Sequence, residues 1–152
     1  MKIAIGADHG GFLHKEAIKK HLIERGFEVK DFGTNDDKST DYNGYAIMVS
    51  ESVRDHKYDR GILICGTGIG MSVMANKVEG IRAALVHDLF TAKATRLHND
   101  TNVLTMGGRV IDIKKAIKIV DIWLDTEFSN DERHIRRINK IDSYKGEWSW
   151  EN

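Results

Sequence analysis

Short apolar runs alternate with segments of helical periodicity along most of this 152-residue chain. The apolar runs predict buried strands at 2–6, 27–32, 60–65, 81–87 and 102–106. The periodic segments predict helices at 12–25, 45–54, 71–78, 89–98, 113–126 and 131–141. This alternation is typical of a parallel sheet covered by helices on both faces. We therefore expect an α/β fold: a three-layer αβα doubly wound sheet of five parallel strands in the flavodoxin-like order 2-1-3-4-5.

The chain contains no linker long enough to divide it, so we expect one domain at 1–141 and a tail at 142–152 that carries Trp148 and Trp150. Lys+Arg and Asp+Glu both number 23, and this zero formal charge argues against nucleic-acid or membrane-surface binding. A single cysteine excludes an internal disulfide and a multi-cysteine zinc site. No apolar run is long enough for a membrane span, and the N-terminus does not resemble a signal peptide. We interpret the protein as cytoplasmic.

The most chemically informative stretch is 62–72, where an apolar run passes through Cys65 into a loop with glycine at every second position. Backbone N–H groups at the start of the following helix favour negative charge, so Cys65 is a candidate thiolate base or nucleophile. The alternative is an inert buried cysteine, the commoner role of a lone thiol. Glycines leave room for a ligand and let several N–H groups stabilise an oxyanion. Thr67 lies in this loop and could lend a hydroxyl or only stabilise the turn.

In doubly wound sheets, ligands bind beyond the carboxyl ends of the strands, where the strand order reverses. In the expected order, that point lies between the first and third strands. The turn with Asp8 and His9 should therefore lie beside the loop that follows Cys65. An Asp-His pair can bind a metal, but adjacent side chains diverge and no third ligand is evident, so we disfavour a metal site.

Other candidates lie further along the chain. His98 ends a predicted helix and could serve as an acid or base, or could only complement the helix dipole. Arg133 and Arg137 are four residues apart and share a helical face, while Arg109 follows the last predicted strand. Guanidinium groups suit phosphate because their planar fork binds two oxygens, although a solvated basic face is the alternative.

Together these segments make the chain resemble the type B ribose-5-phosphate isomerases, within a larger group that includes the galactose-6-phosphate isomerase subunits. The resemblance runs from Met1 to about Ile141. The matching segments are 6–11 (GADHGG), 31–34 (DFGT), 41–42 (DY), 61–70 (GILICGTGIG), 75–77 (ANK), 80–83 (GIRA), 98–100 (HND), 107–110 (GGRV), and Arg133-His134 with Arg137.

The resemblance implies an aldose–ketose isomerase without metal or organic cofactor. Cys65 would move a proton between C1 and C2 through an enediolate, while His98 would open the furanose ring with Asp8 as its proton partner. The resemblance also implies that Thr67 assists proton movement on the oxygens and that Tyr42 and Asn99 contact the sugar. The oxyanion would be bound by the loop with Gly66, Gly68, Ile69 and Gly70. The phosphate would be bound by His9, Arg109, Arg133 and Arg137. The resemblance further implies a homodimer, or a homotetramer built as a dimer of dimers, in which each site borrows the segment 98–109 from the neighbouring subunit.

Two departures from the family pattern bear on substrate choice. Asn43-Gly44 replaces the usual proline after the Asp-Tyr pair, and Asn130-Asp131-Glu132 stands where two glycines usually occur. We expect interconversion of ribose 5-phosphate and ribulose 5-phosphate. The alternatives are isomerisation of allose 6-phosphate, galactose 6-phosphate or a free rare aldose, and a non-enzymatic flavodoxin-like nucleotide-binding module. The nucleotide alternative is disfavoured because the dinucleotide fingerprint and the phosphate-loop lysine are both missing.

Overall fold

The computed structural model describes residues 1–146, so Trp148 and Trp150 of the expected tail at 142–152 lie outside the described residues. The strands are β1 (Lys2–Ala7), β2 (Glu28–Asp31), β3 (Arg60–Cys65), β4 (Ala83–Leu85) and β5 (Val103–Gly107). The helices are α1 (Phe12–Glu24), α2 (Tyr42–Arg54), α3 (Ile69–Ala75), α4 (Leu89–Asn99), α5 (Ile113–Asp125) and α6 (Glu132–Ser143). Every strand and helix expected from the periodicity is present, and the α/β class is confirmed.

The sheet is parallel throughout, but its order is β2-β1-β3-β5-β4, so the expected order of the last two strands is wrong. Every residue of β5 is buried, as a central strand requires, whereas β4 is three residues long and partly exposed. A short and partly exposed strand suits the edge of the sheet. Because β5 and β4 have exchanged places relative to the expected order, β5 pairs with β3 and Gly107 lies directly opposite Cys65.

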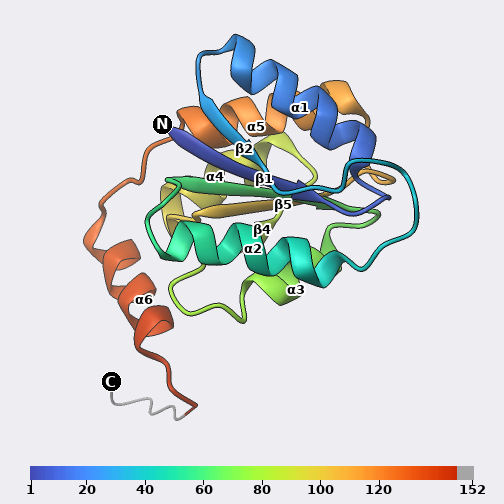
Figure 1. Ribbon diagram of the computed structural model, residues 1–152. Helices are drawn as coiled ribbons and strands as arrows, with labels where there is room; N and C mark the ends of the chain where they lie inside the picture. The colour runs from blue at the N-terminus through green and yellow to red at the C-terminus, as the bar shows by residue number, and fades with distance from the viewer. Residues whose placement is uncertain (147–152) are drawn as a thin grey trace.

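Helices cover both faces of the sheet, and each face buries its own apolar cluster (Figure 1). On one face, α1, α4 and α5 pack over the larger cluster, in which Trp123 is fully buried and its indole N–H donates to Thr101 Oγ1 at 3.0 Å. On the other face, α2 and α3 pack over a cluster that includes Cys65. Each fully buried aliphatic or aromatic side chain contributes about 1.5–3 kcal/mol to folding.

Helix α6 lies outside these layers, at the side of the molecule where β1 begins (Figure 1). Ser129 N–H donates to the Leu97 carbonyl at 3.2 Å, and the rings of His98 and His134 lie 4.7 Å apart between centroids. These contacts attach α6 to the end of α4. Among residues 1–146, no helix is long and apolar enough to cross a membrane.

Candidate active site

Cys65 is the last residue of β3, and its thiol is held inside the glycine loop. The side chain is buried, and the Gly68 N–H donates to its sulfur across 3.1 Å. Gly68 has a φ of +77°, and a Cβ built there would lie 2.6 Å from the Met106 carbonyl carbon. Only glycine accommodates both the left-handed backbone and this close approach. The loop therefore turns a backbone N–H donor back onto the Cys65 sulfur.

The Asp8 turn lies against this loop, as the topology predicted. A Cβ at Gly10 would lie 2.8 Å from the backbone nitrogen of Gly66, so the two turns are in contact. Asp8 is buried, and its Oδ1 accepts the Gly10 N–H at 2.8 Å. The carboxylate thus shapes the turn and remains beside the glycine loop.

His9 is oriented by a contact that was not anticipated from the sequence. Its Nδ1 accepts the Thr40 backbone N–H at 3.3 Å. In the neutral imidazole the proton then lies on Nε2, which is left as a donor for an anion. Thr40 follows a run of polar residues in the loop between β2 and α2, and that run carries no signal of which side chain the Thr40 backbone will contact.

Tyr42 and Thr67 lie on the open side of the glycine loop. Helix α2 begins three residues earlier than expected, at Tyr42, whose ring would meet a Cβ on Gly70 at 2.6 Å. Thr67 is exposed, and its Oγ1 accepts the Ile69 N–H at 3.3 Å. Both side chains can therefore reach a molecule bound over the loop.

Arg109 reaches the same place from β5 of the same chain. Backbone N–H groups of Gly108 and Arg109 donate to the carbonyls of Cys65 and Gly66 at 2.8 and 3.0 Å. A Cβ at Gly66 would lie 3.2 Å from a guanidinium nitrogen of Arg109. The expectation that the whole segment 98–109 comes from a neighbouring subunit therefore needs correction, since Arg109 lies beside Gly66 of its own chain. The cause is the exchanged strand order, which makes β5 the neighbour of β3.

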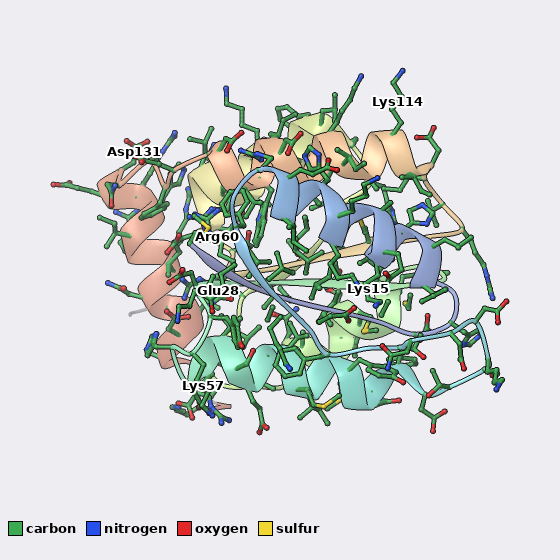
Figure 2. The ribbon with its side chains drawn as sticks, turned by 45° about the horizontal axis from the view of Figure 1, so that its top comes forward. Lys15, Glu28, Lys57, Arg60, Lys114 and Asp131 are labelled. Carbon is green, nitrogen blue, oxygen red and sulfur yellow. The ribbon has the colours of Figure 1, made fainter. Side chains whose placement is uncertain are left out.

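A second group lies at the amino edge of the sheet, where the parallel strands begin. It consists of His98, Asn99, Arg133 and Arg137. The Asn99 carbonyl accepts from Arg82, which immediately precedes β4, so the end of α4 lies at the amino ends of the strands. Figure 2 shows Arg60, the first residue of β3, at the same end of the molecule as Asp131, which precedes α6. The register pairs Gly61 with Val103 and Cys65 with Gly107, so these two edges are separated by about 13 Å of strand.

The amino-edge group is basic and solvent-facing. His98, Asn99, Arg133 and Arg137 are all exposed, whereas His134 is buried and donates to or accepts from Ser129 Oγ at 2.8 Å. Desolvation, and then the charges of Arg133 and His98, lower the pKa of His134. The departure at Asn130-Asp131-Glu132 places the Asp131 carboxylate 3.7 Å from Arg133. The sequence signal for a packed His134 is its four-residue spacing to Ile138, the other buried residue of α6, because residues four apart share one face of a helix.

The candidate residues thus form two groups in one chain. The carboxyl-edge group contains Asp8, His9, Tyr42, Cys65, Gly66, Thr67, Gly68, Ile69, Gly70 and Arg109, and the amino-edge group contains His98, Asn99, Arg133 and Arg137. The first group offers a thiol, a carboxylate and anion donors in one place, which suits proton transfer on an anionic substrate. Within residues 1–146, no three His, Cys, Asp or Glu side chains are grouped to hold a metal ion.

Comparison with known proteins gives a consistent set of relatives. A model of the Ribose/Galactose Isomerase family matches residues 3–141. A putative sugar phosphate isomerase, YwlF, of Bacillus subtilis is 54% identical over 95% of this chain and 97% of its own. Ribose-5-phosphate isomerase B of Escherichia coli is 48% identical over 92% of this chain and 93% of its own.

Two further relatives bear on the substrate. A solved structure of ribose-5-phosphate isomerase B from Mycoplasma genitalium, with bound ribulose-5-phosphate, is 43% identical with a TM-score of 0.90 and covers 94% of this chain and 95% of its own. D-erythrulose-4-phosphate isomerase 2 of Mycolicibacterium smegmatis is 40% identical over 96% of this chain and 98% of its own.

Proposed function

This chain belongs to the ribose/galactose isomerase family, and we propose that it interconverts ribose 5-phosphate and ribulose 5-phosphate. The observation that carries the proposal is the Cys65 thiol, which lies in a glycine loop that donates an N–H to its sulfur. The Mycoplasma genitalium relative with bound ribulose-5-phosphate supports the choice of substrate. The reaction is an aldose–ketose isomerisation, and it needs a base beside a carbonyl carbon and donors for the developing oxyanion.

The proposed proton transfer uses Cys65 as its base. The thiolate removes the proton from C2 of the open-chain aldose, the electrons form an enediolate, and the thiol returns the proton to C1. Thr67 assists proton movement between the two oxygens. The Gly68 N–H is directed at the sulfur and the Ile69 N–H at Thr67 Oγ1, so we assign the oxyanion mainly to the amides of Gly66 and Gly70.

The proposed substrate contacts come from both edges of the sheet. At the carboxyl edge, His9 Nε2 and Arg109 donate to the phosphate and Tyr42 contacts the sugar. Ring opening by His98, with Asp8 as its partner, requires the two edges to meet. A second copy of the chain would supply His98, Asn99, Arg133 and Arg137 to the Cys65 site of the first. We therefore propose a homodimer, or a homotetramer made of two such dimers, with shared active sites.

A second candidate is isomerisation of another sugar phosphate. The Mycolicibacterium smegmatis relative is named for D-erythrulose 4-phosphate, and Asp131 reduces the positive charge around Arg133 in this chain. Allose 6-phosphate, galactose 6-phosphate and a free aldose remain further substrates to compare. Membership of an isomerase family displaces the nucleotide-binding alternative. We place the enzyme in the cytoplasm, where a free thiol such as Cys65 stays reduced.

The decisive experiment measures turnover of ribose 5-phosphate, ribulose 5-phosphate, erythrulose 4-phosphate and allose 6-phosphate, with and without a chelator. We expect the highest kcat/KM for the pentose phosphates and no effect of the chelator. Cys65→Ala should lower kcat by about 10³-fold because the base is removed. The matched control is Ser50→Ala, which deletes a buried hydroxyl in the middle of α2. Full activity in Cys65→Ala would refute the base, and loss of turnover with chelator would refute the metal-free mechanism.

A further inference from the structure

His87 lies just beyond the end of β4, at the carboxyl edge of the sheet. The ladder between β4 and β5 ends where the Val86 N–H donates to the Thr105 carbonyl at 3.0 Å. Two residues further along β5, the Gly107 N–H also points toward the β4 side, because the backbone groups of alternate residues in a strand point in the same direction. The Gly107 N–H donates to Nε2 of the His87 imidazole, and the two nitrogens are 2.9 Å apart. A side chain thus replaces the carbonyl that would continue the ladder.

Gly107 begins the turn that lies against the Cys65 loop. A Cβ on Gly107 would be 2.8 Å from the carbonyl carbon and oxygen of Thr67. The next two N–H groups, those of Gly108 and Arg109, donate to the carbonyls of Cys65 and Gly66. The Gly107 peptide is therefore held between the His87 ring on one side and the catalytic loop on the other.

The hydrogen bond specifies the protonation state of His87. Because the backbone N–H donates, Nε2 must accept, so the ring is neutral and its proton lies on Nδ1. Burial lowers the pKa of His87, the Lys115 ammonium at the start of α5 lowers it further, and Asp88 acts in the opposite direction. The Asp88 carboxylate is itself occupied by Thr91, whose N–H and hydroxyl donate to it at 2.8 and 2.7 Å. Protonation of the ring would turn Nε2 into a donor, so the Gly107 N–H would lose this acceptor.

We propose that His87 is a positioning residue for the isomerase site, whose neutral ring holds the Gly107–Arg109 turn against the Cys65 loop. The inference rests on the proposed isomerase function. His87 has no assigned role in the proton transfer itself, and it acts through the backbone of Gly107, whose N–H its Nε2 accepts. Protonation of the ring in acid releases that turn, and the placement of Arg109 and of the loop carbonyls is lost with it.

Two variants separate the acceptor from the rest of the ring. In His87→Gln, the amide oxygen lies the same number of bonds from Cα as Nε2, so it can accept from Gly107 but cannot be protonated in this range. His87→Leu keeps the bulk and removes the acceptor. His21→Leu is the control, since His21 pairs with Asp121 between α1 and α5. Each variant is assayed for kcat and KM from about pH 5.5 to about pH 8, across the range in which histidine titrates. The alkylation rate of Cys65 by iodoacetamide is measured over the same range.

We expect His87→Leu to lower kcat/KM about five-fold at neutral pH and to change the Cys65 alkylation rate, as the loss of one hydrogen bond would. His87→Gln should restore both and should lose less activity than the native protein as the pH falls. His21→Leu should follow the native profile. A glutamine variant as impaired as leucine, or one with the native acid profile, would overturn the proposal.

The alkylation rate separates a failure of this proposal from a failure of the proposed function. If the native protein turns over no sugar phosphate, the isomerase function is refuted, and alkylation alone then decides the role of His87. An unchanged alkylation rate in His87→Leu would refute the positioning role even if isomerase activity is high. If His87→Leu does not fold, His87→Asn replaces it, because its amide oxygen is one bond too short to reach Gly107.

Discussion

Single glycines set the geometry around Cys65. Gly68 turns its N–H toward the sulfur, and Gly10 allows the Asp8 turn to approach Gly66. Neither position has room for a Cβ, because the nearest backbone atoms would lie at 2.6 and 2.8 Å. The loop therefore owes its shape to backbone packing as well as to the local turn.

Gly68→Ala tests this dependence. The substitution forces a residue with a Cβ into φ of +77° and against the Met106 backbone, so we expect it to destabilise the fold by about 1–3 kcal/mol. The Gly68 N–H should also move off the Cys65 sulfur, and kcat should fall more than the substrate affinity. Urea denaturation and steady-state kinetics measure the two effects. Gly44→Ala is the control, because a Cβ there meets nothing within 4 Å; equal losses in both variants would contradict the role of Gly68.

Among the secondary-structure elements, α1 and β2 are joined by a partly buried ionic cluster. The Lys15 ammonium is fully buried and contacts Asp31 Oδ2 at 2.5 Å, while Lys19 contacts the same oxygen at 2.7 Å (Figure 2 labels Lys15). Glu16 completes the cluster at 2.6 Å from Lys15. Desolvation raises the pKa of Asp31, but the hydrogen bonds from Lys15 and Lys19 outweigh it and leave the pKa below its ordinary value. The cluster fixes the end of β2 on α1.

Asp31→Asn should reduce stability at neutral pH by about 2 kcal/mol, less than for a fully buried pair because Asp31 keeps some contact with solvent. The folded-state pKa of Asp31 is depressed, so its contribution is complete above the ordinary carboxyl pKa and is lost as pH falls through the depressed value. The difference in unfolding free energy between the native protein and the variant should therefore shrink in acid. Urea titrations at several pH values measure it.

The control for this prediction is Asp55→Asn, which removes an exposed carboxylate paired with Arg54 and Lys57. Exposed pairs contribute little, so this variant should remain close to the native protein at neutral pH. A difference for Asp31→Asn that stays constant into acid would show that its charge is not the cause.

For the molecule as a whole, the main feature is the separation of the candidate residues into two groups. Cys65 and Arg109 lie at the carboxyl edge of the sheet, while His98 and Arg133 lie at the amino edge with α6. The roughly 13 Å of strand between the two groups exceeds the length of any side chain. The shared site that we propose would therefore combine two chains, arranged so that the carboxyl edge of one meets the amino edge of the other.

Mixing two inactive variants tests this arrangement. In a shared site, Cys65→Ala and His98→Asn subunits that exchange should rebuild one native site per mixed dimer. Activity should rise from nearly zero toward about a quarter of the native value, as random pairing of subunits predicts when the symmetric interface joins any two chains. Mixing after denaturation and refolding, followed by turnover assays and sedimentation, provides the measurement. Mixed dimers that form but stay inactive would contradict the shared site.

Local patterns were enough for much of this molecule. Periodicity identified every helix and strand because burial repeats at the spacing of each element, and the glycine spacing after Cys65 indicated the loop. The contact between the Asp8 turn and that loop also followed, because right-handed crossovers leave few topologies. Family resemblance supplied the isomerase function.

Long-range packing decided the rest. The order of β4 and β5 depends on which strand can be buried on both faces. Because β5 is the strand beside β3, Arg109 lies beside Gly66. The contacts of Thr40 with His9 and of His87 with Gly107 join segments 31 and 20 residues apart, which no local pattern records. Cys65 lies at the carboxyl ends of the strands and His98 at their amino ends, and this separation likewise follows only from the assembled parallel sheet. Each end of the sheet brings together residues that are distant in the chain.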